Sequence, residues 1–247
     1  MRIKDNIFII KQKLPSISAM IITISLLMNF LCAFKAVATD YDGGDLDIYR
    51  YNRNDEMNIA LTFDDGPHPR LTPKILDVLD KYGIKATFFI IGVNAEYYPA
   101  ALEEIASRGH EIGNHTYSHP HVSDIGKNDL KREVERCESV IFQSTQCHTR
   151  LFRPPEGMID GGVKSVLRSL DYKVILWDID TRDWAQTPPR EIASHVIKNI
   201  KSGDIILMHD YISYNSPTVE ALELFVPVLL EKGYNFVVIS ELIGLHK

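Results

Sequence analysis

The chain has 247 residues, 45% of them hydrophobic and 24% charged, with a formal net charge of −6 at pH 7. This length is enough for one large domain with a substantial core. Residues 1–38 hold five Lys or Arg residues and one Asp, so without them 22 basic and 32 acidic residues remain, a net charge of −10. This acidic balance excludes nucleic acid as an expected partner.

The first 38 residues differ from the rest of the chain. Four basic residues between positions 2 and 13 precede an uncharged run over residues 17–34, and Ala36-Val37-Ala38 follows. This order is typical of a secretory signal peptide with an Ala-x-Ala cleavage site, so we expect a secreted or envelope-associated protein. The run is also near the lower length limit of a membrane span, so an N-terminal membrane anchor is the alternative.

Polar residues rich in Gly and Asp occupy positions 39–56, which predicts a linker before a domain over residues 57–247. Along that domain, apolar or β-branched runs alternate with helical patterns. The predicted strands are 59–63, 86–91, 110–113, 151–153, 173–178, 204–209 and 235–239. The predicted helices are 73–82, 97–108, 128–143, 162–170, 189–201 and 218–232, and Pro73 is expected at the first helical position, after Thr72 as N-cap.

This alternation implies an α/β fold of parallel strands joined by right-handed crossovers. Seven such strands predict a closed or nearly closed barrel with helices outside, and an open doubly wound sheet is the alternative. In either architecture the carboxyl ends of the strands share one rim. Charged residues follow strand after strand at these ends, as a shared active site predicts and core packing does not. They are Asp64, Asp65, Arg153, Asp180, Asp183, His115, His119 and His209.

A metal site is predicted at this rim. His115 and His119 stand four residues apart directly after a predicted strand, a spacing that brings both imidazoles close enough for one cation. Asp64 and Asp65 end another strand before a Gly-Pro turn, so one carboxylate can complete the site and leave the other free as a base. Two imidazoles and one carboxylate leave positions open for water and substrate, as catalytic zinc requires; non-haem iron uses the same ligand set.

Two cysteines remain beyond the leader, and two interpretations stay open for them. In an exported chain, Cys137 and Cys147 could form a disulfide. Alternatively, Cys137 is a buried apolar residue, because it shares one helical face with Leu130, Val134 and Ile141.

Five motifs in order resemble those of the polysaccharide deacetylases, family four of the carbohydrate esterases, and the resemblance covers residues 57–242. The motifs are Thr62-Phe63-Asp64-Asp65-Gly66-Pro67, His115-Thr116-Tyr117-Ser118-His119, Arg153-Pro154-Pro155-Glu156-Gly157, Asp180-Thr181-Arg182-Asp183-Trp184 and Leu207-Met208-His209. The resemblance implies a distorted (β/α)7 barrel and a divalent metal, usually zinc, held by Asp65, His115 and His119.

The resemblance, together with the chemistry of these groups, gives a hypothesis for the mechanism. Asp64 is the expected general base, and His209 is the expected general acid that protonates the leaving amine. Arg153 would keep Asp64 ionised, and Asp183 would keep His209 protonated.

The third motif departs from the family pattern, which commonly has an aromatic residue where this chain has Glu156. By resemblance, the backbone N–H of Glu156 would stabilise the oxyanion. Its carboxylate adds negative charge near the site, which favours a cationic over an anionic substrate. Trp184 and Leu207 are expected to form the acetyl pocket, and Leu207 is equally explained as barrel core. His110 and His121 flank the second motif but do not fit its spacing, and we expect both at the surface.

The function expected from this resemblance is metal-dependent removal of N-acetyl groups from an extracellular or cell-envelope polysaccharide, with release of acetate. Peptidoglycan and chitin-like chains are the leading substrates, and a monomer is expected. One alternative is an esterase that removes acetyl groups from sugar hydroxyls. The other is a glycan-binding pseudoenzyme, for which Glu156 is the support.

Overall fold

The computed structural model describes residues 46–53, 56–211 and 215–245, so the predicted leader lies outside the described residues. Parallel strands form one sheet in the order β1-β6-β5-β4-β3-β2-β8-β7, with β9 paired to β2. The strands are β1 (Ile48–Tyr49), β2 (Asn58–Asp64), β3 (Thr87–Ile90), β4 (Glu111–Asn114), β5 (Leu151–Phe152), β6 (Lys173–Ile175), β7 (Ile179–Asp180), β8 (Ile205–His209) and β9 (Asn235–Phe236).

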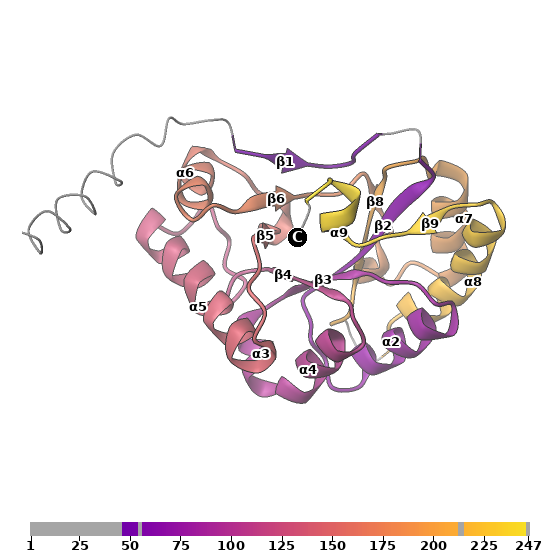
Figure 1. Cartoon of the computed structure of the whole chain (residues 1–247), viewed down its shortest axis with the longest axis horizontal. Helices are drawn as coiled ribbons and strands as arrows, with labels where there is room; N and C mark the ends of the chain where they lie inside the picture. Colours follow the sequence, from indigo (N-terminus) through magenta and orange to yellow (C-terminus); the bar gives the residue numbers. More distant parts are fainter. Residues whose placement is uncertain (1–45, 54–55, 212–214, 246–247) are drawn as a thin grey trace, which may run out of the picture. The chain divides into compact units, whose positions relative to one another are not determined.

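Helices surround this sheet, which curls into a half-barrel, as the sequence predicts. They are α2 (Leu71–Lys81), α3 (Gly92–Tyr97), α4 (Pro99–Ser107), α5 (Lys127–Thr145), α6 (Gly161–Ser169), α7 (Pro189–Asn199), α8 (Thr218–Glu231) and α9 (Ile239–Leu242). Figure 1 shows the strands in the middle of the domain, with α2 to α5 along its lower side and α7 and α8 beside β8. The sheet bends far enough that Tyr51, just after β1, forms an antiparallel bridge with Asp204, just before β8.

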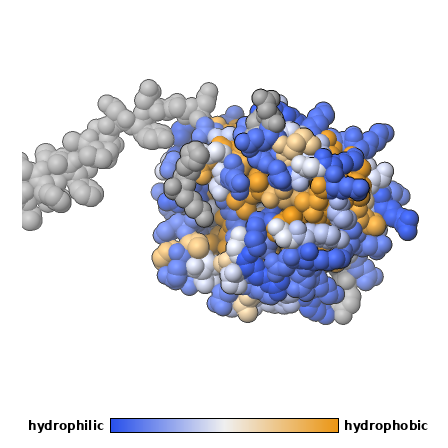
Figure 2. Space-filling model, turned by 45° about the vertical axis from the view of Figure 1, so that its right-hand side comes forward, coloured by the Kyte–Doolittle hydropathy of each residue, from blue (hydrophilic) through white to orange (hydrophobic). Residues whose placement is uncertain are grey.

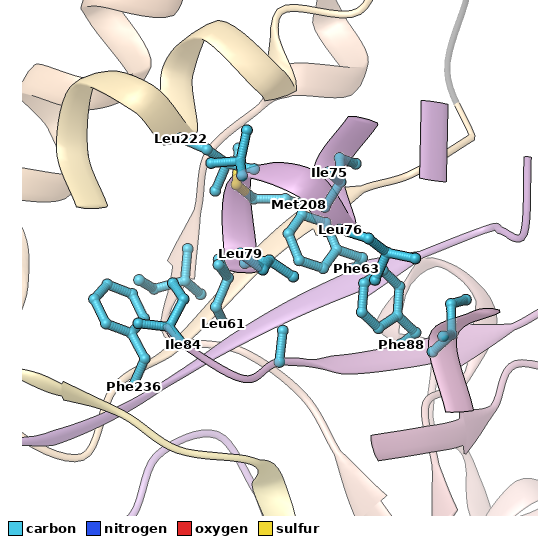
Figure 3. Packing of buried hydrophobic residues seen from close by; sticks show 14 of the residues in the cluster. Leu61, Phe63, Ile75, Leu76, Leu79, Ile84, Phe88, Met208, Leu222 and Phe236 are labelled. Carbon is cyan, nitrogen blue, oxygen red and sulfur yellow. The ribbon is translucent and has the colours of Figure 1, made fainter. Parts of the chain in front are cut away.

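The main core lies between the sheet and the helices. Figure 3 shows Leu61 and Phe63 of β2 packed with Met208 of β8 and with residues of α2 and α8. The rings of Phe63 and Phe88 stack with their centroids 4.9 Å apart. Because side chains alternate between the two faces of a strand, Thr62 and Asp64 point to the barrel interior instead. The outward-facing side chains of β2 therefore pack in the core, and its inward-facing side chains contribute to the site.

Short strands and their neighbours account for the differences from prediction. The stretch predicted as a linker contains β1, which pairs with β6, and β7 pairs with β8 without having been predicted. The strand predicted over 235–239 ends at Phe236, and Ile239 begins α9. A strand of two residues has no periodicity to detect, so only pairing with distant segments defines it.

The start of α2 also differs from prediction. The helix begins at Leu71, so Pro73 is its third residue and not its first. Thr72 does not cap the helix; its hydroxyl donates to the Asp210 carboxylate over 2.6 Å. The side chain of His68 takes the capping role, because its Nδ1 accepts from the backbone N–H of Leu71 over 3.0 Å.

The two cysteines of the described chain are both free, which rules out a disulfide between them. Cys137 is buried in α5 and its thiol donates to the carbonyl of Ile90, whereas Cys147 is exposed beyond the end of that helix. About 12 Å of helix lies between Cys137 and Thr145, well beyond the Cα separation that a disulfide spans. The buried apolar interpretation of Cys137 is confirmed.

The surface of the domain is mixed in character. Figure 2 shows hydrophilic residues over most of the face that it presents, with hydrophobic residues between them. Large exposed hydrophobic residues of the described chain come from several elements and are Ile48, Tyr51, Met57, Tyr97, Met158, Trp184 and Tyr211. Within the described ranges, no helix is both long and apolar enough to cross a bilayer.

Candidate active site and metal centre

The carboxyl ends of neighbouring strands bring the predicted site residues together. β2 ends at Asp64 and β8 at His209, and these two residues are directly paired in the register of the two strands. β4 ends at Asn114, immediately before His115, and Arg153 directly follows β5. The rim predicted from the sequence therefore exists.

Asp65, His115 and His119 form a cluster whose ligand atoms all lie within 4.8 Å of one another. Asp65 Oδ1 is 3.5 Å from the Nε2 atom of each histidine. This carboxylate oxygen is buried and accepts no hydrogen bond from any residue that the structure describes. A buried oxygen left unpaired, with two imidazole nitrogens facing it, fits a divalent cation bound by these three residues.

The backbone and a neighbouring carbonyl hold these ligands in place. His115 Nδ1 lies 2.6 Å from the carbonyl oxygen of Arg153. Since a carbonyl only accepts, Nδ1 carries the proton and Nε2 presents its lone pair to the cluster. Asn94 donates to the backbone carbonyl of Asp65 over 2.7 Å. Asp65 and His119 have φ angles of 74° and 56°, a left-handed conformation that few residues other than glycine adopt.

Protons and a metal ion compete for the imidazole nitrogens of this cluster, and the surrounding charges influence that competition. Burial by itself would lower the pKa of His115, but the carboxylates of Asp64 and Asp65 outweigh it and raise that pKa. Burial and the charge of His115 lower the pKa of His119. A cation must displace any proton from Nε2 of His115, so its affinity falls as the pH falls.

Asp64 is held by a fully buried arginine. Its Oδ1 accepts from Arg153 Nη1 over 2.7 Å, while its Oδ2 lies 3.7 Å from His115 Nε2. Arg153 is 0% exposed, and its Nη1 also donates to Thr62 Oγ1 over 2.8 Å. Burial lowers the pKa of Arg153, and Asp64 partly restores it. One carboxylate oxygen of Asp64 is thus occupied, and the other faces the metal-binding cluster.

His209 stands on the adjoining strand with a buried carboxylate behind it. Its Nδ1 is 2.8 Å from Asp183 Oδ1, and its backbone N–H donates to Asp183 Oδ2 over 2.9 Å. Thr218 Oγ1 donates to the same Oδ2 over 2.8 Å, which fixes the carboxylate. Burial would lower the pKa of His209, but Asp183 with Asp64 and Asp65 raises it to about 9. The Nε2 atom of His209 therefore carries a transferable proton at neutral pH.

Asp210 is a site residue that the sequence reasoning did not identify. It is fully buried beneath the Asp-Gly-Pro turn, and a Cβ atom on Gly66 would come within 2.0 Å of its Oδ2. Burial raises its pKa to about 7, although Thr72 and the N–H of Gly66 oppose the shift. Glycine is therefore the only residue type that fits at position 66, where the turn lies directly on the Asp210 carboxylate. In the sequence, the position of Asp210 directly after His209 was the sign that it could belong to the site.

The sequence model of the polysaccharide deacetylase family matches residues 51–175, just over half of the chain. The chain belongs to this family. It is 41% identical over 192 residues to a peptidoglycan N-acetylglucosamine deacetylase of Bacillus cereus, a match that covers 77% of this chain and 90% of that one.

Two solved structures of relatives have the same fold. The crystal structure of the Bc1960 peptidoglycan N-acetylglucosamine deacetylase has a TM-score of 0.77 and 33% identity, covering 80% of this chain and 92% of that one. A family 4 acetyl xylan esterase from Clostridium thermocellum, solved with cobalt, has a TM-score of 0.70 and 33% identity, covering 76% and 91%. Fold and family are thus established together.

The predicted substrate-binding residues of this deacetylase lie in different environments. Leu207 is buried in the barrel interior, where it pairs in register with Thr62 two residues before His209. The side chain of Trp184 is exposed at the rim, with the residue 52% exposed, and its backbone N–H donates to the Asp183 carboxylate over 2.9 Å. A role for either side chain in an acetyl pocket stays a prediction.

The third motif forms a tight turn over an aromatic ring. Glu156 is exposed with a φ angle of 56°, and its carboxylate lies 3.2 Å from Nδ1 of the exposed His121. A Cβ atom on Gly157 would come within 2.9 Å of the Trp177 ring, which therefore lies directly beneath this turn. Surface exposure of His121 is confirmed, whereas His110 is buried and the prediction of its exposure is wrong.

Proposed function

We propose that this polysaccharide deacetylase hydrolyses N-acetyl groups of glucosamine units in a cell-envelope polysaccharide, with peptidoglycan as the leading substrate. The products are acetate and a free amino sugar. The relatives named as peptidoglycan N-acetylglucosamine deacetylases support this substrate class, as does a chitooligosaccharide deacetylase of Sinorhizobium fredii. The observation that carries the proposal is the placement of Asp64 and His209, an arginine-held carboxylate and a protonated imidazole, on adjoining strands beside the metal-binding cluster.

Each group has a role that its surroundings support. A divalent metal held by Asp65, His115 and His119, which we take to be zinc, would acidify water and polarise the acetamide carbonyl when bound. Asp64 accepts the proton of the attacking water through the oxygen that Arg153 does not occupy. His209 then donates its Nε2 proton to the nitrogen of the leaving amine, because an unprotonated amine leaves poorly.

Acetate release under controlled metal content tests this proposal. Metal-loaded protein is expected to free acetate from peptidoglycan fragments or N-acetylglucosamine oligomers, to lose this activity with a chelator, and to regain it with added zinc. Acetylated xylan serves as the comparison substrate. Release from xylan alone would favour the esterase alternative, and release from no glycan would favour a pseudoenzyme; either result contradicts the proposal.

The decline of activity at high pH is expected to reflect deprotonation of His209, whose pKa depends on Asp183. A general acid works only while protonated, so activity should decline as the pH rises through about 9, the raised pKa of His209. Asp183→Asn removes the charge that raises this pKa, and we expect the decline to move to lower pH by about one to two units. The measurement is kcat against pH for both proteins, and a decline at the same pH in both would show that another group limits the activity.

Glu156 is expected to influence the choice between neutral and anionic glycans. Its exposed carboxylate repels a carboxylate on the substrate, so Glu156→Gln should raise activity on muramic-acid-containing fragments relative to neutral oligomers by about two- to fivefold at low salt. The ratio of kcat/KM values for the two substrates is measured at low and high ionic strength. An equal change for both substrates would mean that Glu156 acts through shape and not charge.

We further propose that the protein is exported through its first 38 residues and acts as a monomer at the cell envelope. The basic stretch, uncharged run and Ala36-Val37-Ala38 support export. Amino-terminal sequencing of the protein recovered from cells distinguishes a cleaved signal peptide from a retained membrane anchor. Sedimentation of the purified protein measures its oligomeric state.

A further inference from the structure

A pocket of about 510 Å³ lies at the amino-terminal ends of β4 and β5, at the opposite end of the barrel from the metal-binding cluster. Its walls come from the start of these strands, the end of α5 and the segment 238–245. Its volume is in the range of sites that hold one small molecule. None of the residues that line it takes part in the catalytic arrangement described above.

The imidazole of His110, which lines this pocket, carries a buried donor without a hydrogen-bond partner among the described residues. The side chain is 7% exposed, and its Nδ1 accepts from the backbone N–H of Ala86 over 3.2 Å. The proton must therefore sit on Nε2, which finds no hydrogen-bond partner among the described residues. Burial, with Lys85 and Arg108 nearby and against the pull of Asp80, lowers the pKa of His110 to about 4. A neutral N–H donor that no protein atom satisfies favours a ligand with an acceptor.

The rest of the lining combines apolar walls with a cation. The apolar side chains are Ile112, Ile141, Leu151, Val238 and Leu245. Arg150 adds a positive charge, and its side chain is half exposed. Its Nη1 forms a loose ion pair with Glu138 over 3.9 Å, and its guanidinium lies 5.7 Å from the centroid of the Tyr172 ring. Its Nη1 also donates to the carbonyl of Thr149 over 3.2 Å, which leaves the other terminal nitrogen of the guanidinium for a ligand.

Two further polar residues border the pocket, and each is held by neighbouring groups of the protein. Glu111 Oε2 accepts from Thr87 Oγ1 over 2.9 Å and from the backbone N–H of Ser240 over 3.1 Å, which fixes its carboxylate away from Arg150 in the hydrogen-bond network. The imidazole of His148 is engaged by Glu138 over 3.0 Å and stacks on Phe142.

We propose that this pocket binds a small amphipathic anion, an aromatic or branched aliphatic body that carries a carboxylate or sulfonate. The body packs between Ile112, Leu151 and Val238. An acceptor of the ligand receives the Nε2 proton of His110, and its anionic group pairs with Arg150. The site is separate from the catalytic rim and serves a ligand other than the glycan.

The aromatic sulfonate 8-anilinonaphthalene-1-sulfonate is a suitable probe, because it combines the two properties that the lining selects. We expect saturable binding of one probe per chain by fluorescence titration of the native, metal-loaded protein. His110→Phe keeps the edge-on ring contact with Phe88 but removes the donor, and should weaken binding about three- to tenfold. Arg150→Gln should weaken it about two- to fivefold.

Matched controls separate the pocket from general surface binding. Lys198→Gln alters a cation in a different hollow, between α7 and α8, and should leave the probe affinity unchanged. Acetate release and the thermal midpoint show whether each variant is folded. Because His110→Phe also leaves the N–H of Ala86 unpaired, the surface variant Arg150→Gln provides the second test if the first fails to fold.

Cys147 gives an independent readout in the unaltered protein, because it lines the pocket and its thiol is exposed, whereas Cys137 is buried. Bound probe should slow alkylation of Cys147 by N-ethylmaleimide, followed by mass spectrometry of the peptide that contains it. Absence of saturable binding, equal affinity in all variants, or unprotected Cys147 at saturating probe would each overturn the proposal.

Discussion

Asp64→Asn is expected to lower kcat for acetate release by about 10²- to 10⁴-fold, the range for loss of a general base. The amide oxygen can still accept the hydrogen bond that Arg153 Nη1 donates to Asp64 Oδ1. However, the carboxylate oxygen that faces the metal-binding cluster is replaced by an amide NH₂ group, which cannot accept a proton from water. Steady-state kinetics on an N-acetylglucosamine oligomer, with the metal content of each preparation measured by elemental analysis, give the comparison.

The matched control for this variant is Asp180→Asn. Asp180 also ends a strand on the rim, and its carboxylate accepts from the backbone N–H of Arg182 over 2.8 Å, but it makes no contact with the metal-binding cluster. We expect its kcat to stay within about threefold of the unaltered protein. If Asp64→Asn keeps full activity with equal metal content, Asp64 is not the base.

Arg153→Met is expected to lower the free energy of unfolding by about 3–5 kcal/mol, because it leaves the carboxylate of Asp64 buried without its partner. It also removes donors to Thr62 Oγ1 over 2.8 Å and to the carbonyl of Ile175 over 3.1 Å. A thermal or urea denaturation curve measures the loss. Acetate release should fall with it, since the oxygen of Asp64 that receives the proton is no longer oriented.

Arg150→Met is the control for stability. Arg150 lies three residues earlier, immediately before β5, but its side chain is half exposed, so we expect a change within about 0.5 kcal/mol. The double variant Asp64→Asn with Arg153→Met should recover part of the lost stability, because no buried charge then remains unpaired. Similar losses from Arg153→Met and Arg150→Met would contradict a special role for the buried ion pair.

The amino-acid sequence by itself determined the parts of this protein that depend on local pattern. Apolar runs and boundary glycines located the long helices and the longer strands, because burial imposes a period on each. The order of the five motifs pointed to the family and to Asp65, His115 and His119, since each motif lies at or just beyond the carboxyl end of a strand on the common rim.

Only the tertiary structure decided features that depend on contacts between distant segments. β1 became a strand by pairing with β6, and Cys137 stayed apart from Cys147 because α5 separates them. His110 faces a pocket built from three separate segments, and Asp210 lies beneath the turn at Gly66. Burial and hydrogen-bond partners set the charge and exposure of such residues, and neither is specified by neighbours along the chain.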